Sequence, residues 1–246
     1  MSGPIVVDVG NSRVKWGLCS SEQVWSLAAL PPDDPDAWLQ QAQEWKLTSG
    51  QTWIVAGVHP ARRGTLVAWL HERGDTVHVL TSYKQLPVQV EVEVPEKVGI
   101  DRLLNVVAAN RRRQENVAAI LIDAGSAVTV DYVDGNGVFR GGAIFPGFRL
   151  MAQSLHDHTA LLPVVEMDED VLPPGTSTTE AIQAGVLNAV VGGVERLIAA
   201  YHHRFPAAFE IFLTGGDAKP LLAKLHRPIH LWPEMTLEGI LHARRE

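Results

Sequence analysis

Three polar stretches follow apolar runs, and their residue types could bind phosphate and a cation. They are Asp8–Ser12, Asp123–Ser126 and Gly215–Asp217, and each combines a carboxylate with glycine. Glycine lets a backbone approach a ligand closely, and free N–H groups in such turns can bind phosphate oxygens. A carboxylate beside a phosphate needs a cation between them. Asp8 and Asp123 are therefore candidate ligands of Mg²⁺ or of another cation.

Taken alone, each turn is better explained as an ordinary turn in which an Asp or Asn side chain bonds the backbone. Two of them, however, share one pattern: an apolar strand, an acid, any residue, a glycine and a strand that runs back. The pattern occurs at Asp8 and again at Asp123, about 115 residues later. This repetition predicts an internal duplication, with an N-terminal domain over 1–114 and a C-terminal domain over 115–246. Neither a P-loop sequence nor a GxGxxG after a strand is present, which disfavours those two nucleotide-binding folds.

A fourth stretch, Gly99-Ile100-Asp101-Arg102, stands where a helix is expected to begin. Asp101 could be the N-cap of that helix. It could equally be a general base that takes a proton from a hydroxyl nucleophile. Arg102 could bind an anionic substrate through a bidentate contact. The spacing of the residues does not decide between the structural and the catalytic interpretation.

The elements that must position these residues alternate between strand and helix patterns, which indicates an α/β protein. A first hairpin is expected around Gly10–Ser12. Further strands are expected over 53–58, 76–80, 118–122, 127–133 and 211–214, and helices over 36–46, 65–73, 101–114, 148–158 and 178–203. On the last helix Ala181, Gly185, Ala189 and Gly193 recur every four residues, which predicts close packing against the core or a second copy.

The composition excludes several classes of protein. The chain has 246 residues, 46% of them apolar, and a net charge of −7, which argues against nucleic acid or an anionic membrane as the main partner. Cys19 is the only cysteine, so no intrachain disulfide and no cysteine-based zinc site can form. The first residues lack the basic segment of a signal peptide, and no apolar run reaches the ~20 residues that span a bilayer. We therefore expect a cytoplasmic protein.

Four motifs in order along the chain resemble those of type III pantothenate kinases. They are Asp8-Val-Gly-Asn-Ser12, Gly99-Ile-Asp-Arg102, Asp123-Ala-Gly-Ser-Ala-Val-Thr-Val-Asp131 and Gly141-Gly-Ala-Ile-Phe-Pro-Gly147. Each motif is weak alone, but the ordered set is specific, and the resemblance covers about residues 5–217. The family belongs to the actin-like superfamily, with acetate kinase, sugar kinases and the heat-shock ATPases.

The resemblance implies two ribonuclease-H-like domains with the ATP site in the cleft between them, in agreement with the duplication. It also implies a homodimer that uses ATP to phosphorylate pantothenate to 4'-phosphopantothenate, the first step of coenzyme A synthesis. Mg²⁺ and a monovalent cation, K⁺ or NH₄⁺, are the implied cofactors.

The same resemblance assigns roles to single residues. The implied ATP-binding residues are Asp8, Val9, Gly10, Asn11, Ser12, Arg13, Val14 and Lys15 in the first loop, and Ser126 in the second. Asp123 would hold the monovalent cation, and Asp8 is a candidate ligand of Mg²⁺. Gly99, Ile100, Asp101 and Arg102 would bind pantothenate, with Asp101 as the acceptor of the proton of its primary hydroxyl and Arg102 near its carboxylate. A substrate threonine of the family matches Thr178, although Thr179 is adjacent.

The chain departs from the family pattern at a few positions. Ser12 and Ser126 stand where threonine is usual, which keeps the hydroxyl. The family usually has a tyrosine three residues before the proline that precedes Gly99. Here that proline is Pro95 and the position holds Val92, so a substrate contact is missing or is supplied elsewhere.

Two other functions stay open. One is an actin-like kinase with a different acceptor, and the other is a non-catalytic regulator that binds nucleotide. Retention of Asp8, Asp101 and Asp123 together argues against the regulator, because a binding module does not need a general base. His156 and His158 are interpreted as surface residues and not as a metal site, since residues two apart on a helix do not share a face.

Overall fold

The computed structural model describes residues 3–168 and 170–243, and these form two compact units. Unit 1 contains Met1–Arg112, Gly137–Phe139 and Glu234–Glu246. Unit 2 contains Arg113–Asn136 and Arg140–Pro233. The chain thus leaves unit 1 near residue 112 and returns to it with its last segment. The predicted division into 1–114 and 115–246 has one boundary and does not include this return.

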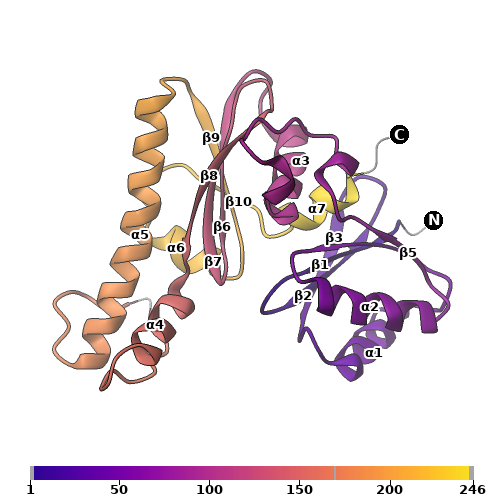
Figure 1. Cartoon of the computed structure of the whole chain (residues 1–246), viewed down its shortest axis with the longest axis horizontal. Coiled ribbons are helices and arrows are strands. Elements are labelled where there is room, and N and C mark those ends of the chain that lie inside the picture. The colour runs from indigo at the N-terminus through magenta and orange to yellow at the C-terminus, as the bar shows by residue number, and fades with distance from the viewer. Residues whose placement is uncertain (1–2, 169, 244–246) are drawn as a thin grey trace. The chain divides into compact units, whose positions relative to one another are not determined.

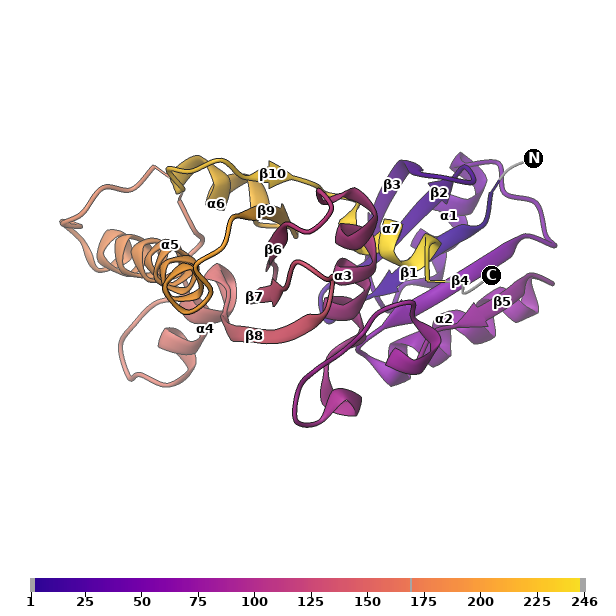
Figure 2. The same ribbon diagram turned by 90° about the horizontal axis from the view of Figure 1, so that it is seen from above.

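Unit 1 is built on a five-stranded mixed sheet (Figures 1 and 2). Its strands are β1 (Ile5–Val9), β2 (Val14–Cys19), β3 (Val24–Leu30), β4 (Thr52–Gly57) and β5 (Thr76–Val79), in the spatial order β3-β2-β1-β4-β5. β1 is antiparallel to β2 and parallel to β4. The predicted hairpin at the start of the chain is therefore confirmed, and β1 lies at the centre of the sheet.

Helices cover both faces of this sheet. The helices of unit 1 are α1 (Pro35–Glu44), α2 (Pro60–Glu72), α3 (Ile100–Arg112) and α7 (Met235–Leu241), with short 3-10 turns at Tyr83–Gln85 and Pro95–Lys97. Figure 1 shows α1 and α2 on one face and α3 and α7 on the other. α2 begins five residues before the predicted helix, because the His59 side chain caps it and Pro60 is suited to the first helical turn.

Tryptophans form much of the core between the sheet and helices α1 and α2. Trp16, Trp38 and Trp53 are fully buried, and the rings of Trp16 and Trp53 meet edge to face with centroids 4.9 Å apart. Trp69 packs partly buried against the same core. Burial of such large apolar rings is a main source of stability in this face of the sheet.

Unit 2 repeats the strand arrangement of unit 1. Its strands are β6 (Ala118–Ala124), β7 (Ala127–Val133), β8 (Phe139–Pro146), β9 (Phe209–Thr214) and β10 (His230–Leu231), in the spatial order β10-β9-β6-β7-β8. β6 is antiparallel to β7 and parallel to β9, as β1 is to β2 and β4. The duplication inferred from Asp8 and Asp123 is therefore visible as two sheets of equivalent order.

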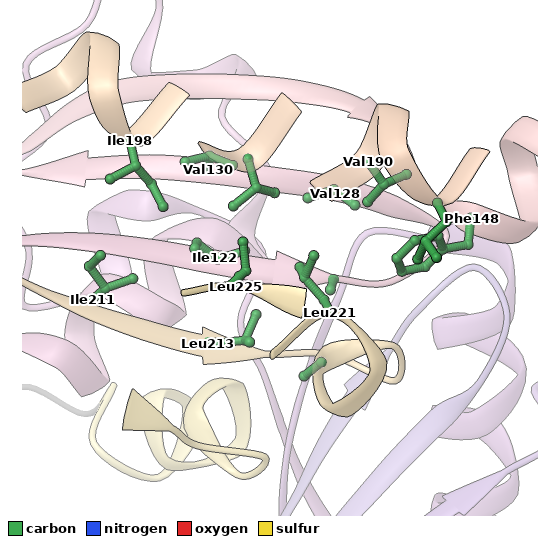
Figure 3. Close-up of a cluster of buried hydrophobic side chains, with 14 of the residues drawn as sticks. Ile122, Val128, Val130, Phe148, Val190, Ile198, Ile211, Leu213, Leu221 and Leu225 are labelled. Atoms are coloured by element: carbon green, nitrogen blue, oxygen red, sulfur yellow. The ribbon is translucent and has the colours of Figure 1, made fainter. Parts of the chain in front are cut away.

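The helices of unit 2 are α4 (Phe148–Asp157), α5 (Thr178–Arg204) and α6 (Ala218–Lys224). Figure 3 shows Val190 and Ile198 of α5 facing Val130 of β7 and other apolar side chains of the sheet. Within the described part of the chain, α5 is the one helix that is long and apolar enough to cross a membrane. Its buried residues recur at helical spacing against the sheet, as in the core helix of a globular domain.

Candidate active site

The first predicted phosphate loop of unit 1 is a closed turn between β1 and β2. The backbone N–H of Gly10 donates to the carbonyl of Arg13 at 3.0 Å, and a Cβ on residue 10 would stand 3.1 Å from that oxygen. Arg62 of α2 donates from Nη1 to the carbonyl of Asn11, which fixes the tip of the turn. A side chain at residue 10 would therefore crowd this carbonyl, and glycine suits the close turn that the sequence predicted.

Asp8 and Lys15 lie directly opposite each other on β1 and β2. Val7 and Val9, on either side of Asp8, belong to the core against α1 and α2. Because neighbours along a strand point to opposite faces, Asp8 and Lys15 are on the face that α3 and α7 cover. A carboxylate and a cation therefore stand at the carboxyl end of β1, on the face that α3 covers.

Asp101 occupies the first turn of α3, which begins at Ile100. Its Oδ1 accepts the backbone N–H of Arg102 at 2.8 Å. Because the helix already includes Ile100, Asp101 is inside it, and the N-cap interpretation of Asp101 is wrong. The residue before the helix is Gly99, which has no side chain to cap with.

Burial raises the pKa of the Asp101 carboxyl above its ordinary value, against the lowering effects of the Arg102 N–H and of the charges on Arg102 and Lys15. Lys15 of the first loop and Asp101 of α3 therefore act on each other through their charges. A carboxyl with a raised pKa that remains near two cations has the character expected of a general base.

Gly99 gives the Asp101 carboxylate its space. A Cβ on residue 99 would lie 2.6 Å from Asp101 Oδ1 and 3.8 Å from Val58 Cγ1. The side-chain space at residue 99 is therefore partly filled by the carboxylate itself, and any larger residue there would displace it.

Unit 1 has a cavity of about 390 Å³ that Gly99 and Ile100 help to line, whereas Asp101 is not among its lining residues. Its walls come from the end of β4, from α2, from both 3-10 segments and from the amino end of α3. The lining residues are Gly57, Val58, Arg63, Thr81, Ser82, Tyr83, Pro95, Glu96, Val98, Gly99 and Ile100. Of the five predicted substrate residues, Gly99 and Ile100 thus line a cavity of ligand size.

Arg102, the fourth predicted substrate residue, lies over the ring of the buried Phe139 with its guanidinium carbon 5.4 Å from the ring centroid. Such a cation–π contact fixes the orientation of the guanidinium. Arg102 is not among the residues that line the cavity of unit 1.

The second predicted phosphate loop, in unit 2, is joined to two further segments. The N–H of Gly125 donates to the carbonyl of Ala127 at 3.1 Å, so this turn, like the Gly10 turn, is closed by a backbone bond of its glycine, although it is one residue shorter. The Ser126 carbonyl accepts the N–H of Gly147 at 2.9 Å, and the N–H of Asp217 donates to the carbonyl of Ala124 at 2.9 Å. The structure therefore brings the second and third glycine-rich stretches together around Ser126.

Asp123 has oxygen-bearing neighbours on both adjacent strands. It lies opposite Thr129 of β7 and beside Thr214 of β9. The hydroxyl of Thr129 is buried and has no hydrogen-bond partner among the described residues. In unit 1 the position opposite the equivalent acid holds the cation Lys15, whereas here it holds a hydroxyl. An orphaned hydroxyl beside a carboxylate is a donor set that suits a hard cation bound by oxygen.

Thr178, the predicted substrate threonine, is the first residue of α5 in unit 2. It lines an apolar groove of about 440 Å³ with Pro146, Met151 and Leu155, whereas Thr179 is not among the lining residues. The groove therefore favours Thr178 over its neighbour as a contact residue.

Among the described residues no cluster of three His, Cys, Asp or Glu side chains could hold a metal. The ring nitrogen Nδ1 of His156 lies 2.8 Å from the carbonyl oxygen of Leu162.

Sequence reasoning did not single out Arg63 and Tyr83, which line the cavity of unit 1, or Thr129 with its buried hydroxyl. Arg63 and Tyr83 occupy ordinary positions in a helix and a loop, so no local pattern marks them. Thr129 could have been noticed from the sequence pattern. It alternates with Val128 and Val130 along a strand, so its side chain is on the same face of the sheet as that of Asp131.

Comparisons with known proteins identify the family of the chain. A sequence model of the family type III pantothenate kinase matches residues 4–200. A protein named Type III pantothenate kinase from Synechococcus sp. (strain JA-2-3B'a(2-13)) is 34% identical over 243 residues, 96% of this chain and 87% of that protein. The protein of the same name from Alkalilimnicola ehrlichii is 32% identical over 250 residues, 98% of each chain.

Among solved structures, the activator of the 2-hydroxyisocaproyl-CoA dehydratase from Clostridium difficile, with bound ADPNP, is similar with a TM-score of 0.53 at 12% identity. The match covers 99% of this chain and 92% of that one, and it supports the predicted two-domain α/β fold of the actin-like type. The family match extends over most of the chain, and the chain belongs to the type III pantothenate kinase family.

Proposed function

We propose that this protein transfers the γ-phosphoryl group of ATP to the primary hydroxyl of pantothenate, forming 4'-phosphopantothenate, and that Asp101 is the general base. The observation that carries the proposal is the placement of Asp101: its carboxyl, of raised pKa, lies at the amino end of α3 and fills the side-chain space of Gly99, which itself lines a cavity. Membership of the family supplies the reaction. Asp101 supplies the group that phosphoryl transfer to an alcohol needs on the acceptor side.

In this mechanism Asp101 accepts a hydrogen bond from the acceptor hydroxyl and orients its oxygen toward the γ-phosphorus. The new O–P bond forms as the bond between the γ-phosphorus and the bridging oxygen breaks. The hydroxyl proton passes to the Asp101 carboxylate, and ADP leaves with the electron pair of the broken bond. Phosphoryl transfer depends mainly on such positioning and on neutralisation of charge.

The phosphates are assigned to the glycine-rich turns of both units. The proposed contacts are the backbone from Asp8 to Val14 and the ammonium of Lys15 in unit 1, and the Ser126 hydroxyl in unit 2. When bound, Mg²⁺ and a monovalent cation supply further positive charge, with Asp8 as the proposed carboxylate for Mg²⁺. Asp123 and Thr129 fit the monovalent cation, K⁺ or NH₄⁺, because the Thr129 hydroxyl is otherwise without a partner.

The nucleoside of ATP is assigned to a cavity of about 460 Å³ in unit 2. Phe148, Arg149, Leu187 and Asp217 are among its lining residues. Asp217 is hydrogen-bonded through its backbone to Ala124, two residues from Ser126. The cavity is therefore adjacent to the turn that we assign to the phosphates, and its mixed apolar and polar wall suits a nucleobase.

We also propose that the protein is a homodimer and works in the cytoplasm. Unit 2 exposes large apolar side chains, among them Ile144, Leu161 and Val164, which are 61%, 92% and 60% exposed. Leu162, the neighbour of Leu161 in the sequence, lines the apolar groove that Thr178 also lines. Exposed apolar surface of this kind is typical of protein interfaces, and a second copy of the chain is the partner that the family resemblance implies.

The first experiment is the release of ADP from ATP and Mg²⁺, with and without pantothenate, in K⁺ and then in Na⁺ buffer. We expect release that depends on pantothenate and is faster in K⁺. The variant Asp101→Asn should lose most of this turnover and remain folded. Normal turnover in that variant would remove Asp101 from the role of base. ATP turnover that ignores pantothenate would point to a kinase with another acceptor, and ATP binding without turnover would point to a regulator.

A further inference from the structure

We propose that Thr236 of α7 and Asn105 of α3 are positioning residues, which fix where Asp101 stands relative to the turn between β1 and β2. The inference rests on the proposed function and deepens it, because it names what holds the general base in place. It gives a role in the reaction to the last helix of the chain, which contains none of the motifs that the sequence analysis singled out.

A buried hydrogen bond joins the two helices. The Thr236 hydroxyl donates to Oδ1 of Asn105 at 2.8 Å, and the two residues are only 3% and 1% exposed. A hydrogen bond weakens steeply with distance and angle, whereas apolar contact is not directional. The bond therefore favours one relative position of α3 and α7, which the apolar residues around it do not specify.

Asn105 lies one helical turn from the base. Asp101 and Asn105 are four residues apart in α3, so their side chains lie on the same face of the helix, one above the other. A helix transmits a displacement along its length because its backbone is rigid. Any shift or rotation of α3 at Asn105 is therefore passed on to the carboxylate of Asp101.

The backbones of the two helices approach each other beside this bond. A Cβ on Gly239 would stand 2.0 Å from the carbonyl oxygen of Leu104 and 3.0 Å from its Cα. Gly239 follows Thr236 by three residues and so lies on the same side of α7, and Leu104 directly precedes Asn105. α7 therefore holds α3 by two neighbouring contacts, a hydrogen bond and a close backbone approach.

Another side of α7 is fixed to the sheet that carries the first predicted phosphate loop, since α7 packs against β1 and β2. A Cβ on Gly17 of β2 would lie 3.2 Å from Leu237 Cδ1 and 2.9 Å from Val6 Cγ2. Val6 is two residues before Asp8 on β1, hence on the same face of the sheet. α7 thus connects the strand that contains Asp8 with the helix that contains Asp101. Their separation matters, because phosphoryl transfer depends on the positions of acceptor and phosphate.

The test compares the wild type with Thr236→Val, Thr236→Ser and the double variant Asn105→Leu, Thr236→Val. Thr236→Val deprives the buried Asn105 amide of this partner, whereas the double variant replaces both polar groups by apolar groups of similar shape, which costs little stability. Leu70→Val is the matched control. Leu70 is fully buried in the core on the α1 and α2 face of the sheet, so its shortening lowers stability away from α3 and α7. For each protein kcat, the KM for ATP and the melting temperature are measured.

We expect Thr236→Val to lower kcat by about tenfold and to leave the KM for ATP unchanged, because a misplaced base slows the reaction without weakening nucleotide binding. Thr236→Ser should keep the kcat of the wild type. The double variant should regain the melting temperature that Thr236→Val loses but not its kcat, since apolar contact does not fix the position of α3. Leu70→Val should lose melting temperature and keep kcat.

A wild-type kcat in Thr236→Val would overturn the inference. So would a kcat that recovers together with the melting temperature in the double variant, because the bond would then serve stability alone. An equal loss of kcat in Leu70→Val would have the same meaning.

Hydrogen exchange of the segment 100–107, measured without substrates, separates this inference from the proposed function. If the bond positions α3, exchange there should be faster in Thr236→Val than in Leu70→Val. Equal exchange in the two variants would contradict the positioning of α3 by α7. If the wild type shows no turnover that depends on pantothenate, the proposed function fails, whereas the exchange still decides whether α7 positions α3.

Discussion

Gly99 and Asp101 compete for the same space: a Cβ on residue 99 would stand 2.6 Å from Oδ1 of Asp101. The absence of a side chain at residue 99 is therefore what allows the carboxylate to occupy its place. Since the Gly99 backbone is not in the left-handed region, its substitution is strained by this one contact and not by its backbone conformation.

Gly99→Ala should consequently lower kcat with little loss of stability. The added methyl group must push the carboxylate away, and a misplacement of about 1 Å in a catalytic group can cost roughly 100-fold in rate. Steady-state kinetics and thermal unfolding check this. Gly64→Ala is the matched control, because a Cβ at residue 64 of α2 meets no other atom within 4 Å. Wild-type kcat in Gly99→Ala would show that the carboxylate is not held where the reaction takes place.

The parts of the candidate site that are local could be proposed from the sequence. Asp8 and Asp123 were identifiable because an acid, a glycine and a returning strand occur twice in the sequence. The two sheets have equivalent strand orders, as this repeat predicts. Asp101 was identifiable only as one of two alternatives. The exact start of α3, one residue earlier than predicted, decided against the cap.

The parts that could not be predicted depend on contacts between distant segments. The seven-residue helix α7 returns to unit 1, where a Cβ on Gly239 would stand 2.0 Å from the carbonyl of Leu104. No short pattern marks such a close approach between helices. Arg63 and Tyr83 reach one cavity from a helix and a loop, and their residue types alone are ordinary. The Thr129 hydroxyl became notable only once it was found to be buried without a partner.

Replacement of Asp101 by Asn should not destabilise the protein at neutral pH. Because burial raises the pKa of the folded Asp101 carboxyl, the folded protein holds this proton more tightly than the unfolded chain. Stability then falls as the pH rises from the unfolded pKa through the raised folded pKa, and the whole cost is present above it. Asn carries no charge and avoids that cost.

The melting temperature of Asp101→Asn relative to wild type, measured at pH 4 and at pH 8, tests this sign. We expect the difference to be more favourable to the variant at pH 8. A variant that is clearly less stable than wild type at pH 8 would mean that the carboxylate is needed chiefly for its bond to the Arg102 N–H.

Lys15 should set the pH at which the enzyme becomes active. The base works in its ionised form, so kcat/KM should fall as the pH drops through the pKa of Asp101. The charge on Lys15 lowers that pKa, hence Lys15→Met should raise it further and move the acid limb of the profile to higher pH. Arg13→Met is the comparison, because Arg13 is not among the groups that act on Asp101. If the acid limb of the kcat/KM profile of Lys15→Met lies at the same pH as in the wild type, the charge of Lys15 does not influence the pKa of Asp101.

Thr129 should be measurable as part of the cation site without any assay of turnover. Thr129→Val is nearly the same size and removes an unpartnered buried hydroxyl, so the variant without cation should be as stable as wild type or more stable, by up to about 1 kcal/mol. The rise in melting temperature that K⁺ produces in the wild type should shrink or disappear. Thr129→Ser keeps the hydroxyl and should keep the response, and Asp123→Asn should lose it. An unchanged response to K⁺ in Thr129→Val would exclude its hydroxyl as a ligand.

The apolar surface of unit 2 should hold two copies of the chain together. Ile144 and Leu161 are 61% and 92% exposed, and a carboxylate at either position would have to be buried in the proposed interface without a partner. The double variant Ile144→Asp, Leu161→Asp should therefore dissociate at concentrations about tenfold or more above those at which the wild type does, since burial of an unpaired charge costs several kcal/mol. Light scattering coupled to size-exclusion chromatography gives the mass directly. Trp25→Asp is the control, because Trp25 is 64% exposed but belongs to unit 1, and this variant should keep the wild-type mass. A double variant that remains dimeric at the same concentrations would show that this surface is not the interface, and a change of mass in Trp25→Asp would move the interface to unit 1.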